Sequence, residues 1–144
     1  MVRVETRSIL IVANQTAGAA HLKTLVRDRM AAGPCRFTLL VPATPPAEHM
    51  TWTEGEARAL AEERLADALA GLRGIGADID GMVGDPRPLS AVGDAVLEHS
   101  YDEIVVSTLP PGASRWLKQD LPHRVERQFR LPVTHIVAEP ATKP

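Results

Sequence analysis

The sequence is poor in aromatic residues and has a single cysteine. Two tryptophans, two phenylalanines and one tyrosine make up 3% of the 144 residues, whereas 44% of the residues are hydrophobic. Alanine, valine and leucine must therefore build the core of what we expect to be a single domain, residues 1–144. Cys35 excludes an internal disulfide framework and fits a reducing compartment, so we expect a cytoplasmic protein. Its thiol is expected to be a small buried group next to a strand.

The chain also lacks a strong charge of either sign and any long apolar run. Sixteen lysines and arginines oppose eighteen acidic residues, a net charge of -2, which argues against nucleic acid or a membrane surface as a partner. The first apolar block, residues 9–13, is too short for a signal peptide or a membrane-spanning helix. Residues 1–7 and 139–144 are expected to be frayed ends.

Short apolar runs alternate with helical patterns along the chain. The runs at 8–13, 36–41, 78–83, 103–108 and 133–137 predict strands, and the patterns at 19–32, 53–72, 89–99 and 121–129 predict helices. Thr53 and Glu56 form a capping box at the start of the second helix. Several strands are continuously apolar, which suits a parallel sheet covered on both faces. The sequence therefore predicts an α/β fold with right-handed crossovers.

The proline-rich connection 42–51 follows the second strand and cannot be regular structure. It falls at the carboxyl edge of the predicted sheet, where α/β proteins bind ligands, although many such loops are surface connections only.

Three motifs resemble the universal stress protein family over nearly the whole chain. They are Gly84-Asp85-Pro86 after the third strand, Ile-Val-Val-Ser-Thr at 104–108, and the closing stretch 124–137 with Leu131-Pro132-Val133. The resemblance implies a Rossmann-like three-layer α/β/α sandwich whose five-stranded parallel sheet has the order 3-2-1-4-5. It also implies a homodimer that pairs through the last strand, formed by Val133, Thr134, His135, Ile136 and Val137.

Many members of that family bind ATP, and the resemblance implies which positions of this chain correspond to the residues that contact the base in those members. An aspartate ends the first strand in those members, where Ala13-Asn14 stands here, and Val41 matches a valine that packs on adenine. The implied ligand is ATP or AMP with magnesium, although no cofactor is required by the sequence. The candidate nucleotide- or anion-binding residues are Ala13, Asn14, Val41, Gly84, Asp85, Ser107, Gly112, Ser114 and Arg115.

The phosphate-binding loop departs from the family pattern of three glycines and a closing serine or threonine. Its first positions fall on Ser107 and Pro110, and its closing pair falls on Gln119-Asp120, so Gly112 alone remains. Asp120 precedes Leu121-Pro122 and is predicted to cap the last helix, where its carboxylate would occupy the N–H groups that a phosphate needs. Repulsion of about 1–4 kcal/mol per unit charge would then disfavour ATP in the usual pose.

The same loop keeps features that attract an anion. Ser114 and Arg115 follow Gly112 directly, and Lys118 lies nearby, so a smaller anion or a nucleotide held differently could bind. Trp116 could stack on a base or pack on the core as a lid.

No catalytic or metal-binding residues are predicted. Ser114, Asp120 and His123 offer the residue types of a hydrolase triad, but they lie in one ten-residue stretch without a nucleophile elbow. The five histidines have no metal-ligand spacing, and the basic residues of the last helix are expected to form a solvated face.

The sequence leaves three functions open. The first is a non-catalytic, homodimeric stress-response or regulatory module. The second is a nucleotide-binding switch or weak ATP hydrolase. The third is an unrelated small-molecule enzyme on the same fold. It has the least support because no pair of acidic or basic residues has a spacing that indicates acid/base catalysis.

Overall fold

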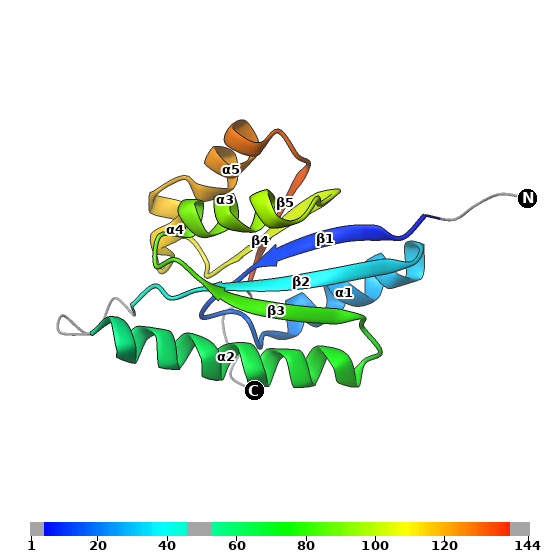
Figure 1. Cartoon of the computed structure of the whole chain (residues 1–144), viewed down its shortest axis with the longest axis horizontal. Coiled ribbons are helices and arrows are strands. Elements are labelled where there is room, and N and C mark those ends of the chain that lie inside the picture. The colour runs from blue at the N-terminus through cyan, green and yellow to red at the C-terminus, as the bar shows by residue number, and fades with distance from the viewer. Residues whose placement is uncertain (1–4, 46–52, 139–144) are drawn as a thin grey trace, which may run out of the picture.

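A computed structural model describes residues 5–45 and 53–138 of the chain and shows a five-stranded parallel sheet with helices on both faces (Figure 1). The strand order is β3-β2-β1-β4-β5, as predicted, and each neighbouring pair is parallel. The elements in chain order are β1 Arg7–Val12, α1 Ala20–Ala32, β2 Cys35–Pro42, α2 Glu54–Gly74, β3 Ile79–Gly84, α3 Pro88–Glu98, β4 Glu103–Thr108, α4 Arg115–Lys118, α5 Leu121–Phe129 and β5 Val133–Val137.

The sheet forms the middle of three layers because its inner strands bury side chains on both faces. Helices α1 and α2 cover one face, and α3, α4 and α5 cover the other (Figure 1). In β1, Ile9 and Ile11 join the core beneath α1 and α2, whereas Leu10 and Val12 join the core beneath α3 and α5. Successive side chains of a strand point to opposite faces of the sheet, so a strand that is covered on both faces needs apolar residues at every position. This explains the continuous apolar run from which the strand was predicted.

Local sequence determines where the long helix α2 begins. The hydroxyl of Thr53 accepts a hydrogen bond from the backbone N–H of Glu56 at 3.1 Å and donates to its carboxylate at 3.2 Å. The Thr53 cap of the predicted capping box is therefore confirmed, whereas Glu56 contacts the hydroxyl of Thr53 and not its backbone N–H. The helix reaches Gly74, two residues beyond the predicted end. The single turn α4 was not predicted, because four residues show no helical periodicity.

The prediction that Asp120 caps α5 with its side chain is wrong. Asp120 has left-handed backbone angles, φ 55° and ψ 42°, and its side chain makes no capping hydrogen bond. A capping side chain requires extended backbone angles at this position, so the carboxylate turns away instead. It accepts a hydrogen bond from His123 Nδ1 at 2.7 Å and lies 3.9 Å from the guanidinium of Arg127.

Three further expectations about local structure need correction. Pro42 is the last residue of β2 and not part of an irregular connection. A proline at the end of a strand is tolerated because it removes only its own N–H donor from the hydrogen bonds between strands. Cys35 lies within β2, half-buried, rather than next to it, and burial raises the pKa of its thiol. Arg7 is the first residue of β1 and not part of a frayed end. The remaining expectations for the two ends, residues 1–4 and 139–144, lie outside the described residues. The same holds for residues 46–51 of the proline-rich connection and for Trp52.

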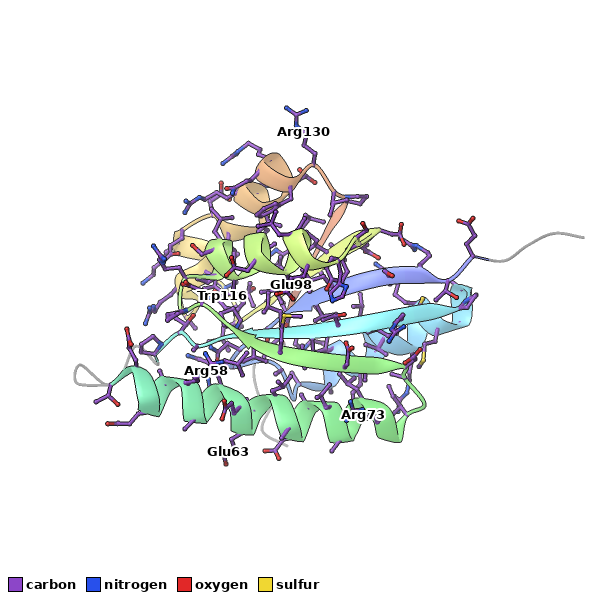
Figure 2. All side chains as sticks on the ribbon, viewed as in Figure 1. Arg58, Glu63, Arg73, Glu98, Trp116 and Arg130 are labelled. Atoms are coloured by element: carbon purple, nitrogen blue, oxygen red, sulfur yellow. The ribbon has the colours of Figure 1, made fainter. Side chains whose placement is uncertain are left out.

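Most charged side chains project outward, with Glu103 of β4 as a buried exception. Glu63 on α2 and Arg130 after α5 point away from the body (Figure 2), whereas Trp116 is buried in the core beneath α3 and α5. Within the part of the chain that the structure describes, β5 pairs only with β4, so it forms one edge of the sheet. No described helix combines the length and apolar character that crossing a membrane requires.

Candidate functional site

A cavity of about 310 Å³ opens where β1 and β4 end side by side. The chain leaves β1 through α1 on one face of the sheet and leaves β4 through α4 and α5 on the other (Figure 1). The two connections diverge at this topological switch point, which is where open α/β sheets form their ligand-binding crevice. The cavity is lined by residues 14–16, 44–45, 107–109 and 113–116.

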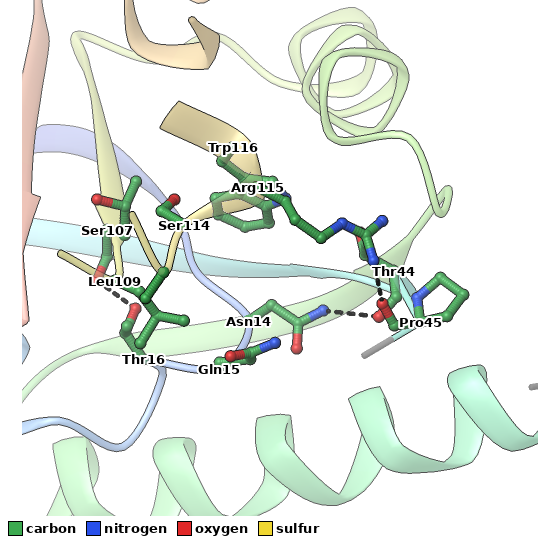
Figure 3. A pocket seen from close by; sticks show the side chains of 12 residues that line it. Asn14, Gln15, Thr16, Thr44, Pro45, Ser107, Leu109, Ser114, Arg115 and Trp116 are labelled. Carbon is green, nitrogen blue, oxygen red and sulfur yellow. Dashed lines mark hydrogen bonds between the residues drawn. The ribbon is translucent and has the colours of Figure 1, made fainter. Parts of the chain in front are cut away.

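Four of the nine residues predicted for a nucleotide or anion site line this cavity. Asn14 follows β1, Ser107 belongs to the end of β4, and Ser114 and Arg115 begin α4. They come from segments up to 101 positions apart, and the sheet brings them together. The structure thus places the loop after β1 and the loop after β4 on opposite walls of one cavity (Figure 3).

The other five predicted residues do not line the cavity. Ala13 and Val41 are fully buried in the core beneath α1 and α2. Gly84 ends β3 against α3, and Asp85 accepts hydrogen bonds from the backbone and side chain of Arg87, whose contacts lower the pKa of the Asp85 carboxyl. Gly112 lies in the turn before α4 with φ +91°, a conformation that favours glycine.

The amide of Asn14 ties the ends of two strands to helix α2. Its Nδ2 group donates to the carbonyl of Pro42 at 2.6 Å and to that of Thr44 at 3.5 Å. Its Oδ1 atom accepts a hydrogen bond from Arg64 of α2. An aspartate in this position could accept from Arg64 but could not donate to Pro42, so the asparagine suits its surroundings.

A second polar cluster forms the wall at the end of β4. The hydroxyl of Ser107 lies 2.6 Å from that of Thr16 and 3.0 Å from Nε2 of His21 in the first turn of α1. Ser107 and Thr16 are 1% and 3% exposed, so this cluster holds β4 against the β1–α1 connection. A buried group of this kind is favourable only when it is hydrogen-bonded, as these are.

The wall opposite Asn14 is built by the short helix α4. Ser114 caps it by accepting from the N–H of Leu117 at 3.1 Å, and Trp116 packs into the core while one side of it faces the cavity. Arg115 reaches across and donates through Nη1 to the carbonyl of Pro45 at 3.0 Å (Figure 3). Ser114 lines this cavity, whereas the His123–Asp120 pair lines another, and no hydrogen bond joins Ser114 to His123 in the described part of the chain, so no triad assembles.

The charge on the described wall of the cavity is positive. Among the described residues that line it, Arg115 carries the only full charge and no carboxylate is present. Asp120 does not line the cavity, so a capping carboxylate does not repel a phosphate there. An arginine keeps four donors after one bond to a carbonyl and can offer a planar pair of them to a phosphate.

Several residues that shape the site were missed from the sequence. Thr16, Thr44 and Gln15 lie in the loops after β1 and β2, where proximity to the carboxyl edge could have marked them. Arg64 and His21 reach the site from helices α2 and α1. Neither has a sequence motif that would distinguish it from a surface residue.

A smaller cavity of about 220 Å³ lies between α5 and β5 and contains two of the residues predicted at the dimer interface. Val133 and His135 line it together with Asp120, His123 and Glu126 among others. The His135 imidazole lies 2.8 Å from the hydroxyl of Thr108, a residue of the main cavity. Burial, reinforced by the charge of His123, lowers the pKa of His135.

The other predicted interface residues lie elsewhere on β5. Thr134 and Ile136 face α1, and Val137 is 37% exposed. No three His, Cys, Asp or Glu residues in the described ranges gather as metal ligands.

Comparison with known proteins supports the fold. No protein-family model matches the chain, and no curated protein matches it. Among solved structures, a universal stress protein in complex with cAMP superimposes with a TM-score of 0.63 at 17% identity, covering 92% of this chain and 98% of that one. Two structures of universal stress protein from Archaeoglobus fulgidus, one of them in complex with dAMP, give TM-scores of 0.60 and 0.57 at 16% identity, with 92% and 93% of this chain and 99% of each of those covered. The chain therefore has the fold of universal stress proteins.

Proposed function

We propose that this chain is a non-catalytic regulatory module of the universal stress protein type that binds an adenine mononucleotide in the main cavity and acts as a homodimer. The observation that carries the proposal is the cavity at the end of β1 and β4, with Arg115 on its wall and no carboxylate among its described lining residues. Two of the similar structures are complexes with cAMP and dAMP, each a nucleotide with one phosphate.

The size and chemistry of the cavity favour one phosphate over three. Ligand pockets span roughly 300–1,000 Å³, so about 310 Å³ lies at the lower end. Magnesium bound to a triphosphate is usually held by one or two protein carboxylates, which the described lining does not offer. The loop after β4 also contains Pro110 and Pro111, which have no N–H to donate to further phosphates.

A hydrolytic role has weaker support. Among the described residues at the cavity, Ser107 and His21 form the one serine–histidine pair within hydrogen-bond distance, at 3.0 Å. A nucleophile must reach its substrate, however, and Ser107 is 1% exposed with its hydroxyl also bonded to Thr16. The pair is better explained as a structural link between β4 and α1.

We predict that Arg115→Ala weakens AMP binding by about tenfold or more, because a hydrogen bond to a charged group is worth about 1.5–3 kcal/mol. Calorimetric titration with AMP, cAMP and ATP–magnesium would measure the affinities, and thermal melting would confirm that both proteins are folded. Arg124→Ala is the matched control, since Arg124 is exposed on α5 and lines neither cavity. Absence of binding by all three nucleotides to the unmodified protein would refute the nucleotide proposal.

The dimer is proposed to form through the edge of β5. An edge strand presents unpaired backbone donors and acceptors, and pairing with a second copy would satisfy them. Val137→Lys places a charge on the exposed part of this edge and is expected to raise the dimer dissociation constant about tenfold or more. Sedimentation velocity over the micromolar range would detect it. Leu97→Lys, on the 87% exposed Leu97 of α3, is the control and should leave the dimer unchanged. A monomer at all concentrations would contradict this assembly.

A further inference from the structure

Most polar side chains that line the main cavity already have partners within the protein. The Thr44 hydroxyl donates to the carbonyl of Pro86, and the Thr108 hydroxyl contacts His135. Ser107 contacts Thr16 and His21, and Ser114 caps α4. By contrast, the described residues supply no hydrogen-bond partner for the side-chain amide of Gln15 or the indole N–H of Trp116. Gln15 is exposed, so its amide is accessible to a ligand.

Asn14, the residue that the resemblance assigns to the base, has little capacity left. A side-chain amide has two N–H donors and one oxygen acceptor. Both donors of Asn14 point to backbone carbonyls, those of Pro42 and Thr44, and its oxygen accepts from the charged Arg64. Asn14 is also 7% exposed. Turning it toward a ligand would leave the Pro42 carbonyl and the Arg64 guanidinium without this partner, which costs free energy.

We propose that Gln15, and not Asn14, contacts the base of the bound nucleotide and determines which base is accepted. This inference rests on the proposed function, since it concerns the ligand of the same cavity. Gln15 lies directly after Asn14 in the loop that follows β1 and lines the cavity wall opposite α4 (Figure 3). Arg115 then holds the phosphate, and Gln15 supplies the one uncommitted amide among the described residues that line the cavity.

The chemistry of an amide gives this assignment a measurable consequence. Glutamine presents one donor and one acceptor side by side, which matches the amino group and adjacent ring nitrogen of adenine. A glutamate in its place accepts two hydrogen bonds and donates none. It therefore loses the bond to the adenine ring nitrogen, whereas it can accept from both N1–H and the exocyclic amino group of guanine.

The test compares AMP with GMP in the unmodified protein and in Gln15→Glu, by calorimetric titration. The ratio of the two affinities is the readout, because both ligands carry the same phosphate and any repulsion by the new carboxylate cancels. We expect the ratio to move toward GMP by about tenfold or more, the usual discrimination of one bidentate base contact. Gln15→Ala, which adds no charge, should weaken AMP binding while leaving the melting temperature of the free protein unchanged.

Gln128→Glu is the matched control, since Gln128 is exposed on α5 and lines neither cavity. It should leave the AMP to GMP ratio at the value of the unmodified protein. If AMP binds and Arg115→Ala weakens it, but Gln15→Glu keeps the original ratio, the assignment of Gln15 is overturned and the nucleotide function stands. If neither nucleotide binds the unmodified protein, the function and the assignment fall together.

Discussion

Replacing Arg29 by methionine is expected to lower the free energy of unfolding by about 3 kcal/mol at neutral pH, because it leaves a buried carboxylate without its main partner. Arg29 of α1 donates from Nε and Nη2 to the two oxygens of Glu103 at 3.0 and 2.8 Å. Glu103, the first residue of β4, is 4% exposed. Thr134 of β5 also donates to this carboxylate, and Arg7 lies 3.6 Å from it. The remaining contacts compensate in part, so we expect the lower end of the usual range.

The size of this loss should depend on pH. Burial alone would raise the pKa of the Glu103 carboxyl, but hydrogen bonds from Arg29 and Thr134 and the charges of Arg29 and Arg7 outweigh burial and hold the pKa below its ordinary value of 4.5. The folded state therefore binds this proton less tightly than the unfolded state. The stabilisation is complete above pH 4.5 and is lost as the pH falls through the lower pKa of the folded state. The difference between Arg29→Met and the unmodified protein should shrink over that acidic window.

Urea denaturation at several pH values would measure this effect. Arg27→Met is the control, because Arg27 lies on the exposed face of the same helix. It should change the unfolding free energy by about 0.5 kcal/mol or less, as surface substitutions do. Equal losses for the two variants, or a loss for Arg29→Met that does not vary with pH, would show that the ion pair contributes no special stabilisation.

Replacing Gly84 by alanine is expected to destabilise the protein by about 2 kcal/mol without changing nucleotide affinity. A Cβ atom at this position would lie 2.8 Å from Cδ1 of Leu40 and 2.9 Å from Cβ of Ala91. Ala91 is part of α3, so the whole helix must shift to make room, and such overpacking costs about 1–3 kcal/mol. Gly84 does not line the main cavity, and the glycine is therefore explained by the close approach of α3 to β3.

Thermal melting and AMP titration of the same variant separate the two roles of this glycine. Gly18→Ala is the control, since no atom lies within 4 Å of a Cβ built there and Gly18 lines neither cavity. It should leave the unfolding free energy nearly unchanged. Should Gly84→Ala instead weaken AMP binding while the melting temperature stays constant, Gly84 would be a ligand-contacting residue, as the family motif implies.

The order of elements could be predicted from local patterns because the inner strands contain short, continuous apolar runs that alternate with helical patterns. Residues 104–106 are fully buried, and such a run suits a parallel strand between two helical layers. The start of α2 was likewise predicted because the Thr53 cap forms with Glu56, only three positions away in sequence. The bounds of α5 were predicted as well, whereas the left-handed backbone of Asp120, which prevents its side chain from capping the helix, has no signal in the sequence.

The sequence by itself determined the layers and the loops that carry the candidate site. Its resemblance to the universal stress protein family also implied that β5 lies at an edge of the sheet. It could not determine which residues in those loops face a ligand. Asn14 and Gln15 are adjacent amides with the same chemistry, and only the tertiary positions of Pro42, Thr44 and Arg64 commit the first to the protein and leave the second accessible. A hydrogen-bonding group has the same capacity in any sequence, whereas the partners that consume that capacity are set by contacts between residues far apart in the chain.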